Sequence, residues 1–149
     1  MIKKIRAEEK LSVSEIETII NGCVEFDTVA FEGVFRFEDT SKHFFMLGKN
    51  AVESLIMVTK PNLRLDFSKA KIFYDLKTLT CKTVFLTLYQ TARNVRIIGL
   101  DLQIRYIGEA TTHTLYGLYN FGHSLLVDRC NIEIYAEKQI NTAALANYG

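Results

Sequence analysis

The sequence lacks tryptophan, contains a single proline and carries almost no net charge. Its 18 Lys and Arg residues are balanced by 17 Asp and Glu residues, for a formal net charge of +1, so electrostatics favour neither nucleic acid nor an anionic membrane as a partner. No stretch approaches the roughly 20 apolar residues that span a membrane. The basic start MIKKIR continues into AEEK rather than into an apolar run, so it does not indicate a secretory signal. We expect synthesis in the cytoplasm, and a later location on a virion or a cell surface stays open.

Cysteine and histidine are also sparse and scattered. The three cysteines, Cys23, Cys81 and Cys130, belong to no CxxC motif or Cys/His cluster, so they predict neither a zinc site nor a disulfide framework. The three histidines have no serine or cysteine nucleophile placed beside them by a motif, so a catalytic triad is not supported. The string GLYNFG lacks the spacing of a phosphate-binding loop. We therefore expect no metal ion and no cofactor.

What the sequence does contain is a repeat of short apolar strands. Three segments begin at Asn62 (NLRLDFSKAKIF), Asn94 (NVRIIGLDLQIR) and Ser124 (SLLVDRCNIEIY), at offsets of 32 and 30 residues. Apolar and polar residues alternate within each segment, which is typical of strands with one buried face. An ungapped alignment gives four apolar columns: Leu63, Val95 and Leu125; Leu65, Ile97 and Val127; Ala70, Leu102 and Ile132; Ile72, Ile104 and Ile134. A fifth column, seven residues before the first, contains Ile56, Leu88 and Leu118.

Strand repeats with this period and no helices between them predict a coiled sheet, in which each turn buries its inner face on its neighbours. We therefore predict an all-β fold, a parallel β-helix of about four turns over residues 23–149. Residues 1–22 are expected to form an N-terminal arm and a short capping α-helix over residues 12–22, which begins at Ser12 or Ser14 and stops at Gly22. Residues 39–54 are the least periodic part of the chain, and we expect a loop or an irregular first turn there.

A capping helix followed by CVEF, FEGVFRF, NLRLDFSKAKI and NVRIIGLDLQI resembles the start of right-handed parallel β-helix proteins of the pectate-lyase-like superfamily. That group includes pectate lyases, polygalacturonases and phage tailspike depolymerases. The resemblance covers about residues 12–149 and consists of apolar columns without a signature motif. It implies a right-handed coil, a polysaccharide as the partner and, by analogy with tailspikes, a homotrimer. Members of the group usually have many more turns than this chain.

The end of the sequence repeats an earlier string. GLYNFG at Gly117–Gly122 corresponds to ALANYG at Ala144–Gly149, and the first copy leads into a further strand whereas the chain stops after the second. We therefore expect the β-helix to be truncated at its C-terminal end, as the N-terminal part of a longer polysaccharide-interacting protein. The alternative is a natural short β-helix that forms a dimer or trimer through its open end or its sides. Asn120 and Asn147 share a column, which predicts a side-chain amide ladder.

Outward positions of the repeats supply the candidate site residues. Asp101 and Glu133 lie one turn and two residues apart, so we expect their Cβ atoms about 7–8 Å apart, a separation compatible with an acid and a base that flank a water in an inverting glycosidase. Arg105 beside them would bind a sugar carboxylate. The candidate substrate-binding set is completed by Gln103, Tyr135 and Lys71. The structural alternative is an exposed sheet face on which mixed charges screen one another.

These residues do not form a complete catalytic constellation. The carboxylates are too few for a calcium-bound lyase site, and tryptophan, a common platform for stacking sugars, is absent. The sequence therefore favours a non-catalytic β-helix scaffold or glycan-contacting module. The alternative is a portion of a polysaccharide-degrading enzyme, a glycoside hydrolase or a lyase, of the kind that the resemblance implies.

Overall fold

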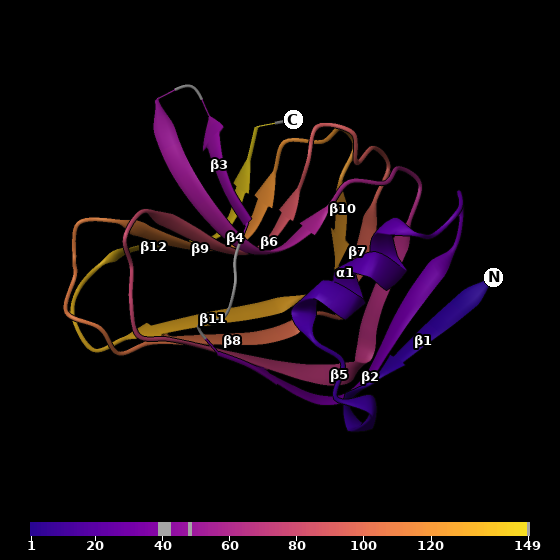
Figure 1. Ribbon diagram of the computed structural model, residues 1–149, viewed down its shortest axis with the longest axis horizontal. Coiled ribbons are helices and arrows are strands. Elements are labelled where there is room, and N and C mark those ends of the chain that lie inside the picture. The colour runs from indigo at the N-terminus through magenta and orange to yellow at the C-terminus, as the bar shows by residue number, and fades with distance from the viewer. Residues whose placement is uncertain (39–42, 48, 149) are drawn as a thin grey trace.

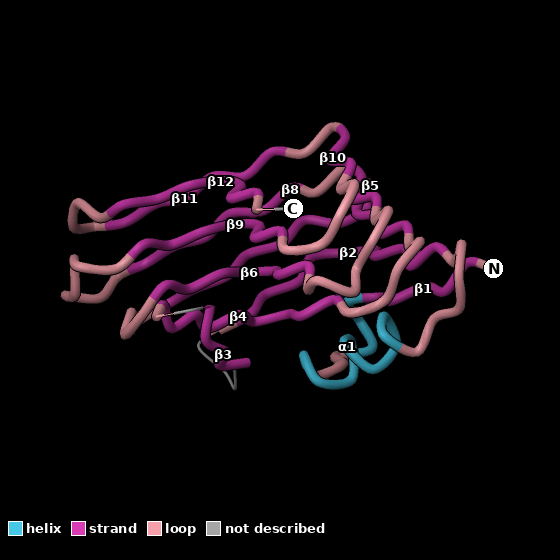
Figure 2. Tube along the Cα trace, turned by 90° about the horizontal axis from the view of Figure 1, so that it is seen from above, coloured by secondary structure: helices cyan, strands magenta, loops and turns pink. Residues whose placement is uncertain are grey.

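The structure, a computed structural model, describes residues 1–38, 43–47 and 49–148. With 57% strand and 9% helix among these residues, it confirms the all-β prediction. The chain coils into a β-solenoid of about 5 turns, and successive turns stack one above another (Figure 2). The predicted parallel β-helix is therefore present, with about one turn more than the sequence repeats indicated, because the first turn lacks their apolar columns.

The strands form two sheets that enclose the core (Figure 1). The first sheet contains β1 (Ile2–Arg6), β2 (Thr28–Phe37), β5 (Arg64–Leu76), β7 (Arg96–Ile98), β8 (Asp101–Tyr106), β10 (Leu126–Asp128) and β11 (Asn131–Ala136). The second sheet has the order β12-β9-β6-β4-β3 and contains β3 (His43–Leu47), β4 (Asn50–Val58), β6 (Lys82–Leu88), β9 (Thr114–Asn120) and β12 (Asn141–Asn147). Among the described strands every pairing is parallel except that of β3 with β4, which is antiparallel.

The register of the first sheet confirms some predicted columns and corrects others. Leu65, Ile97 and Val127 are aligned as predicted. The third and fourth columns are wrong by two residues at β5, because Ile72 rather than Ala70 lies opposite Leu102. Asp66 pairs with Ile98, and Ile72 pairs with Leu102. Between these two pairs β5 has five residues (67–71), whereas the next turn has only three (99–101) at the corner between β7 and β8.

The fifth predicted column is wrong at one residue. Ile56 and Leu118 both pair with Leu86, whereas Leu88 pairs with Val58 and Asn120. The crossing from β6 to β7 takes seven residues, 89–95, where the crossing from β4 to β5 takes five, 59–63. Apolar alternation does not reveal such differences, because corner residues lie outside it.

The interior is apolar and closely packed. Its largest fully buried side chains include Tyr74, Tyr106, Phe67 and Phe85. The rings of Phe31 and Phe67 stack with their centroids 4.3 Å apart. At one corner the predicted amide ladder is confirmed: Asn120 Nδ2 donates to Asn147 Oδ1 at 2.7 Å, and Asn120 Oδ1 accepts from the Gly122 N–H at 2.9 Å. The buried polar side chain of Asn120 is thus satisfied by the next turn and by its own.

An α-helix, α1 (Val13–Asn21), lies beside the first turn at the N-terminal end of the stack, as predicted (Figure 2). Ser12 begins it with a capping box: its hydroxyl accepts from the Glu15 N–H at 3.1 Å, and the Glu15 carboxylate accepts from the Ser12 N–H at 3.1 Å. Ile16 and Ile20 are buried against the core. A short 3₁₀ helix, η1 (Ala7–Glu9), precedes α1.

Side chains of α1 also satisfy part of the edge of β4. Asn21 Nδ2 donates to the Met57 carbonyl at 2.9 Å, and Asn21 Oδ1 accepts from the Thr59 N–H at 2.9 Å. Glu17 accepts from the Met57 N–H at 2.8 Å. The helix therefore replaces a neighbouring strand over these residues, which is one way to protect a sheet edge.

Two parts of the fold differ from the sequence prediction. Residues expected to form an arm contain β1, which pairs in parallel with β2. The segment expected to be a loop or an irregular first turn contains β3 and the first part of β4, which form a hairpin within that turn. Residues 39–42 and 48 of that segment lie outside the described residues. Phe44, Phe45 and Met46 are consecutive apolar residues, so this hairpin shows no polar–apolar alternation.

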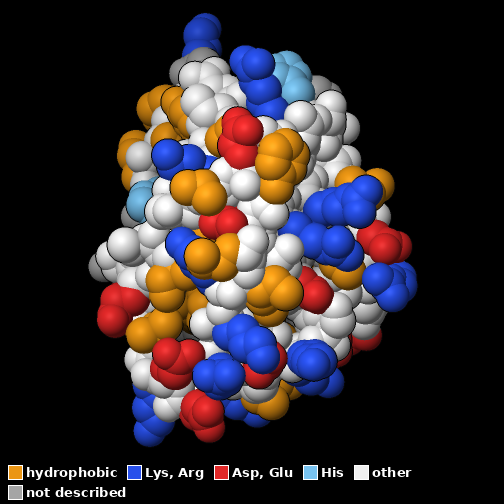
Figure 3. Space-filling view, turned by 90° about the vertical axis from the view of Figure 1, so that its right-hand side faces the viewer, with side chains coloured by type: hydrophobic (Ala, Val, Ile, Leu, Met, Phe, Trp, Pro, Cys, Tyr) orange, Lys and Arg blue, Asp and Glu red, His pale blue; other side chains and the backbone are white. Residues whose placement is uncertain are grey.

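The outer surface beside β1 mixes both signs of charge with apolar side chains (Figure 3). Lys4 Nζ and Arg6 Nε on β1 each lie 3.6 Å from a carboxylate oxygen of Glu32 on β2. These exposed pairs contribute little to stability, but they keep the charge locally balanced. No helix in the described part of the chain is long and apolar enough to cross a membrane.

Candidate functional site

Alternate residues of β5, β8 and β11 point outward and form a polar and aromatic face on the first sheet. Their inward neighbours on β5 and β8, such as Ile72 and Leu102, are buried in the core. Two outward rows cross the three strands: Phe73, Gln103 and Glu133, and Asp75, Arg105 and Tyr135. Adjacent strands in a sheet are about 4.8 Å apart, so residues within a row are direct neighbours.

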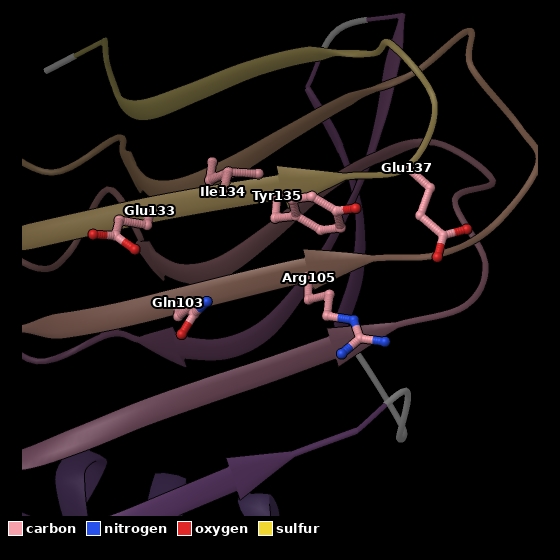
Figure 4. Close-up of a pocket in the computed structure, with 6 residues that line it drawn as sticks. All are labelled: Gln103, Arg105, Glu133, Ile134, Tyr135 and Glu137. Atoms are coloured by element: carbon pink, nitrogen blue, oxygen red, sulfur yellow. The ribbon is translucent and has the colours of Figure 1, made fainter.

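An open pocket of about 580 Å³ lies on this face between β8 and β11. Four of the six residues that the sequence singled out line it, together with two others; the full lining is Gln103, Arg105, Glu133, Ile134, Tyr135 and Glu137. The Tyr135 ring lies between the two ends of the pocket, with Gln103 and Glu133 toward one end and Arg105 and Glu137 toward the other (Figure 4). Glu137 was missed because it follows the last residue of β11, beyond the alternation that identified the rest.

Several polar groups of the pocket are not engaged with the rest of the protein. Among the described residues, no hydrogen bond or ion pair holds the side chain of Gln103, Arg105 or Tyr135. Glu133 makes one long contact, accepting from Asn131 Nδ2 at 3.4 Å. Tyr135 is 54% exposed, so its ring is accessible for stacking. The pocket therefore combines a guanidinium, an amide, carboxylates and an aromatic ring that are available to a ligand.

The other two candidates lie outside this pocket. Asn131 pairs with Asp101 and Glu133 with Gln103, so Asp101 and Glu133 are diagonal neighbours as expected, yet Asp101 does not line the pocket. The ungapped alignment placed Lys71 beside Gln103, but the register places Phe73 there. Lys71 instead pairs with Val34 on β2.

Phe73 is flanked by two cations. The Arg36 guanidinium lies 4.4 Å and the Lys71 ammonium 5.4 Å from the centroid of its ring. Both distances are within the range of cation–π attraction. The Lys71 side chain thus packs on Phe73, which is the direct neighbour of Gln103 on β5, and does not line the pocket.

The arrangement of acidic groups limits the chemistry of the face. Glu133 and Glu137 share the pocket, so two carboxylates are available there. Within the described ranges, no group of three or more His, Cys, Asp or Glu side chains is arranged to hold a metal ion. The pocket lining thus supplies hydrogen-bonding groups, a positive charge, an aromatic ring and two carboxylates.

Comparison with known proteins gave no match: no family model, no curated protein and no solved structure is significantly similar to this chain. The likeness to pectate-lyase-like proteins consequently rests on the apolar columns alone. What is established for this chain is the coarser statement, that it is a β-solenoid of about 5 turns with the character of a parallel β-helix.

Proposed function

We propose that this chain is a non-catalytic β-helix module that binds polysaccharide through the pocket between β8 and β11. One observation carries the proposal: Gln103, Arg105 and Tyr135 converge on one open pocket, and no other described residue engages their side chains. Sugars present hydroxyl groups and a weakly apolar ring face, which match an amide and an aromatic ring. A guanidinium adds affinity for a carboxylate on the sugar.

The rigidity of the scaffold supports this role. The pocket residues project from parallel strands whose other face is packed in the core, so binding does not require the strands to rearrange. The position of Asp101 outside the pocket favours a binding module over an enzyme that uses the Asp101–Glu133 pair, because an acid and a base must flank the same glycosidic bond.

The test is a binding titration of the purified chain with neutral and uronic-acid oligosaccharides. Arg105→Ala should weaken binding of the uronic acids about 10- to 100-fold, since a charge-assisted hydrogen bond contributes about 1.5–3 kcal/mol. Tyr135→Ala should weaken binding of both classes. The matched control is Arg96→Ala, which removes an exposed arginine on β7 outside the pocket. Failure of every oligosaccharide to bind, or binding that ignores Arg105 and Tyr135, would refute the proposal.

A second candidate, cleavage of the polysaccharide, is favoured by the two carboxylates in the pocket. Glycosidases use a pair of carboxylates around the scissile bond. Glu133 and Glu137 lie four residues apart at opposite ends of the pocket (Figure 4), so to act as the acid and base both side chains would have to turn toward the bound sugar. Release of reducing ends or unsaturated products from the same oligosaccharides would reveal this activity. The Glu133→Gln, Glu137→Gln variant should abolish it while binding persists, and Asp101→Asn should leave it unchanged because Asp101 lies outside the pocket.

A further inference from the structure

Among the described strands, β3 is the outermost of the second sheet. It pairs with β4 from His43 opposite Ser54 to Leu47 opposite Asn50. Among the described residues, no strand pairs with its other edge. In Figure 1 the hairpin of β3 and β4 extends outward from the rest of the sheet. An open strand edge presents unpaired N–H and C=O groups that can bind another strand.

The outermost strand at the same end of the first sheet is protected, and β3 is not. Three of the five residues of β1 are basic, Lys3, Lys4 and Arg6, so two β1 strands brought together would repel. The sequence of β3, HFFML, contains no lysine, arginine, acidic residue or proline. Its one titratable side chain, His43, contacts Glu17 on α1. Charge therefore does not oppose pairing of β3 with a second β3.

Two exposed side chains of β3, Phe44 and Met46, are large and apolar. Phe44 is 62% and Met46 55% exposed, on the face of the strand away from Phe45. Phe45 is half-buried, and its ring meets that of Phe121 edge-on at 6.4 Å. One face of β3 is therefore anchored to the protein. The other presents two large apolar side chains beside a backbone edge with which no described strand pairs.

We propose that β3 is a dimerisation edge and that its occupant is β3 of a second copy of this chain, paired antiparallel. A two-fold axis at Phe45 gives the fullest overlap of the five residues and places Phe44 of each chain opposite Met46 of the other. The match is self-complementary in both backbone and side chains, because the same apolar pair forms twice. The two second sheets then become one continuous sheet.

This inference does not rest on the proposed function, because the pocket lies on the first sheet and β3 belongs to the second. A dimer would carry two such pockets. If polysaccharide binding is confirmed, the dimer would therefore bind a repeating polymer more tightly than the monomer does.

The experiment measures mass by light scattering and sedimentation over a dilution series of the complete chain. We expect a dimer that dissociates on dilution, and the Phe44→Lys, Met46→Lys variant should raise the dimer Kd at least about tenfold, because lysines would then face lysines. The matched controls are Ile2→Lys on β1 and Leu126→Lys on β10, at exposed apolar residues of the first sheet. Neither control should change the Kd. Circular dichroism and thermal unfolding of each variant establish that it is folded.

A second measurement on the unmodified protein covers the case in which the lysine variant does not fold. Amide hydrogen exchange of β3 should slow as the protein concentration rises, because the outward N–H groups become paired in the dimer. A wild-type monomer at all concentrations overturns the proposal. So does a dimer that survives both lysines, one that is lost in a control variant, or one whose β3 amides exchange at the monomer rate.

Discussion

Phe26 occupies a backbone conformation that suits asparagine, and its replacement should stabilise the protein. The same corner recurs in four successive turns with a left-handed residue: φ is 68° at Phe26, 57° at Asn62, 55° at Asn94 and 60° at Ser124. The Phe26 N–H donates to the Asn62 carbonyl at 2.8 Å, which places the two residues one above the other. Asparagine tolerates this conformation better than a phenylalanine does.

The size of the effect follows from two contributions. A left-handed conformation costs an ordinary residue about 1–2 kcal/mol, most of which Phe26→Asn should recover. The new side chain would also extend an existing ladder, in which Asn94 Nδ2 donates to Asn62 Oδ1 at 3.2 Å, although an exposed bond of this kind adds about 0.5 kcal/mol. Little burial is lost, because Phe26 is 77% exposed. We expect the free energy of unfolding to rise by about 1–2 kcal/mol and Tm by about 2–8 °C.

Urea and thermal unfolding followed by circular dichroism measure both quantities. The matched control is Phe26→Ala, which removes the exposed ring but keeps a Cβ in the left-handed conformation. It should leave the free energy of unfolding near that of the wild type. If Phe26→Ala stabilises as much as Phe26→Asn, removal of an exposed aromatic ring rather than relief of backbone strain is the cause, and the reasoning is refuted.

Two further predictions concern Asn21 on α1 and the buried Tyr119 on β9. Asn21→Ala removes two half-buried hydrogen bonds, to Met57 and Thr59, and should lower the free energy of unfolding by about 1–3 kcal/mol in a urea titration. Asn21→Asp keeps the acceptor but loses the donor, so it should be at least as destabilising. A neutral result for both variants would contradict the role of Asn21 in covering the edge of β4. Burial and a hydrogen bond with Tyr148 raise the pKa of Tyr119 above the usual 10.0. The folded state then holds that proton more tightly than the unfolded chain, so stability is retained below pH 10 and falls as the pH rises above it. Tyr119→Phe should flatten this alkaline decline in unfolding titrations at successive pH values, and an unchanged slope would show that another group is responsible.

The parts of the fold that the sequence predicted are those in which one strand face is buried. Ile97 and Val127, or Ile104 and Ile134, alternate with polar residues because the neighbouring side chains point to solvent, and this pattern is visible without a structure. The hairpin of β3 was not predicted, because Phe45 packs inward while Phe44 and Met46 are apolar and exposed. Alternation fails as a signal wherever an outward face is also apolar.

The site was predicted for a similar reason and was misplaced where corners differ in length. Gln103, Arg105, Glu133 and Tyr135 alternate with core residues of β8 and β11, whose register the 30-residue offset matches. The alignment used the 32-residue offset between β5 and β7 for the whole repeat, and this offset set Lys71 beside Gln103. Between β5 and β8 the offset is 30, because β5 has two extra residues at the corner. Composition and alternation do not reveal which corner contains the extra residues. Two added residues are one full period of a strand, so the apolar positions alternate in the same way with or without them.

The contact between α1 and β4 shows how a helix can satisfy a strand edge with side chains alone. Residues four apart on a helix lie about 6 Å apart along its axis and on one face, and residues two apart on a strand lie about 6.6 Å apart with their N–H groups on one edge. Glu17 and Asn21 therefore match Met57 and Thr59 in spacing. The Asn21 side chain carries a donor and an acceptor, as a peptide group does, so it satisfies both the Met57 carbonyl and the Thr59 N–H. Glu17 needs only an acceptor for the Met57 N–H, and the same carboxylate also contacts His43, the first residue of β3.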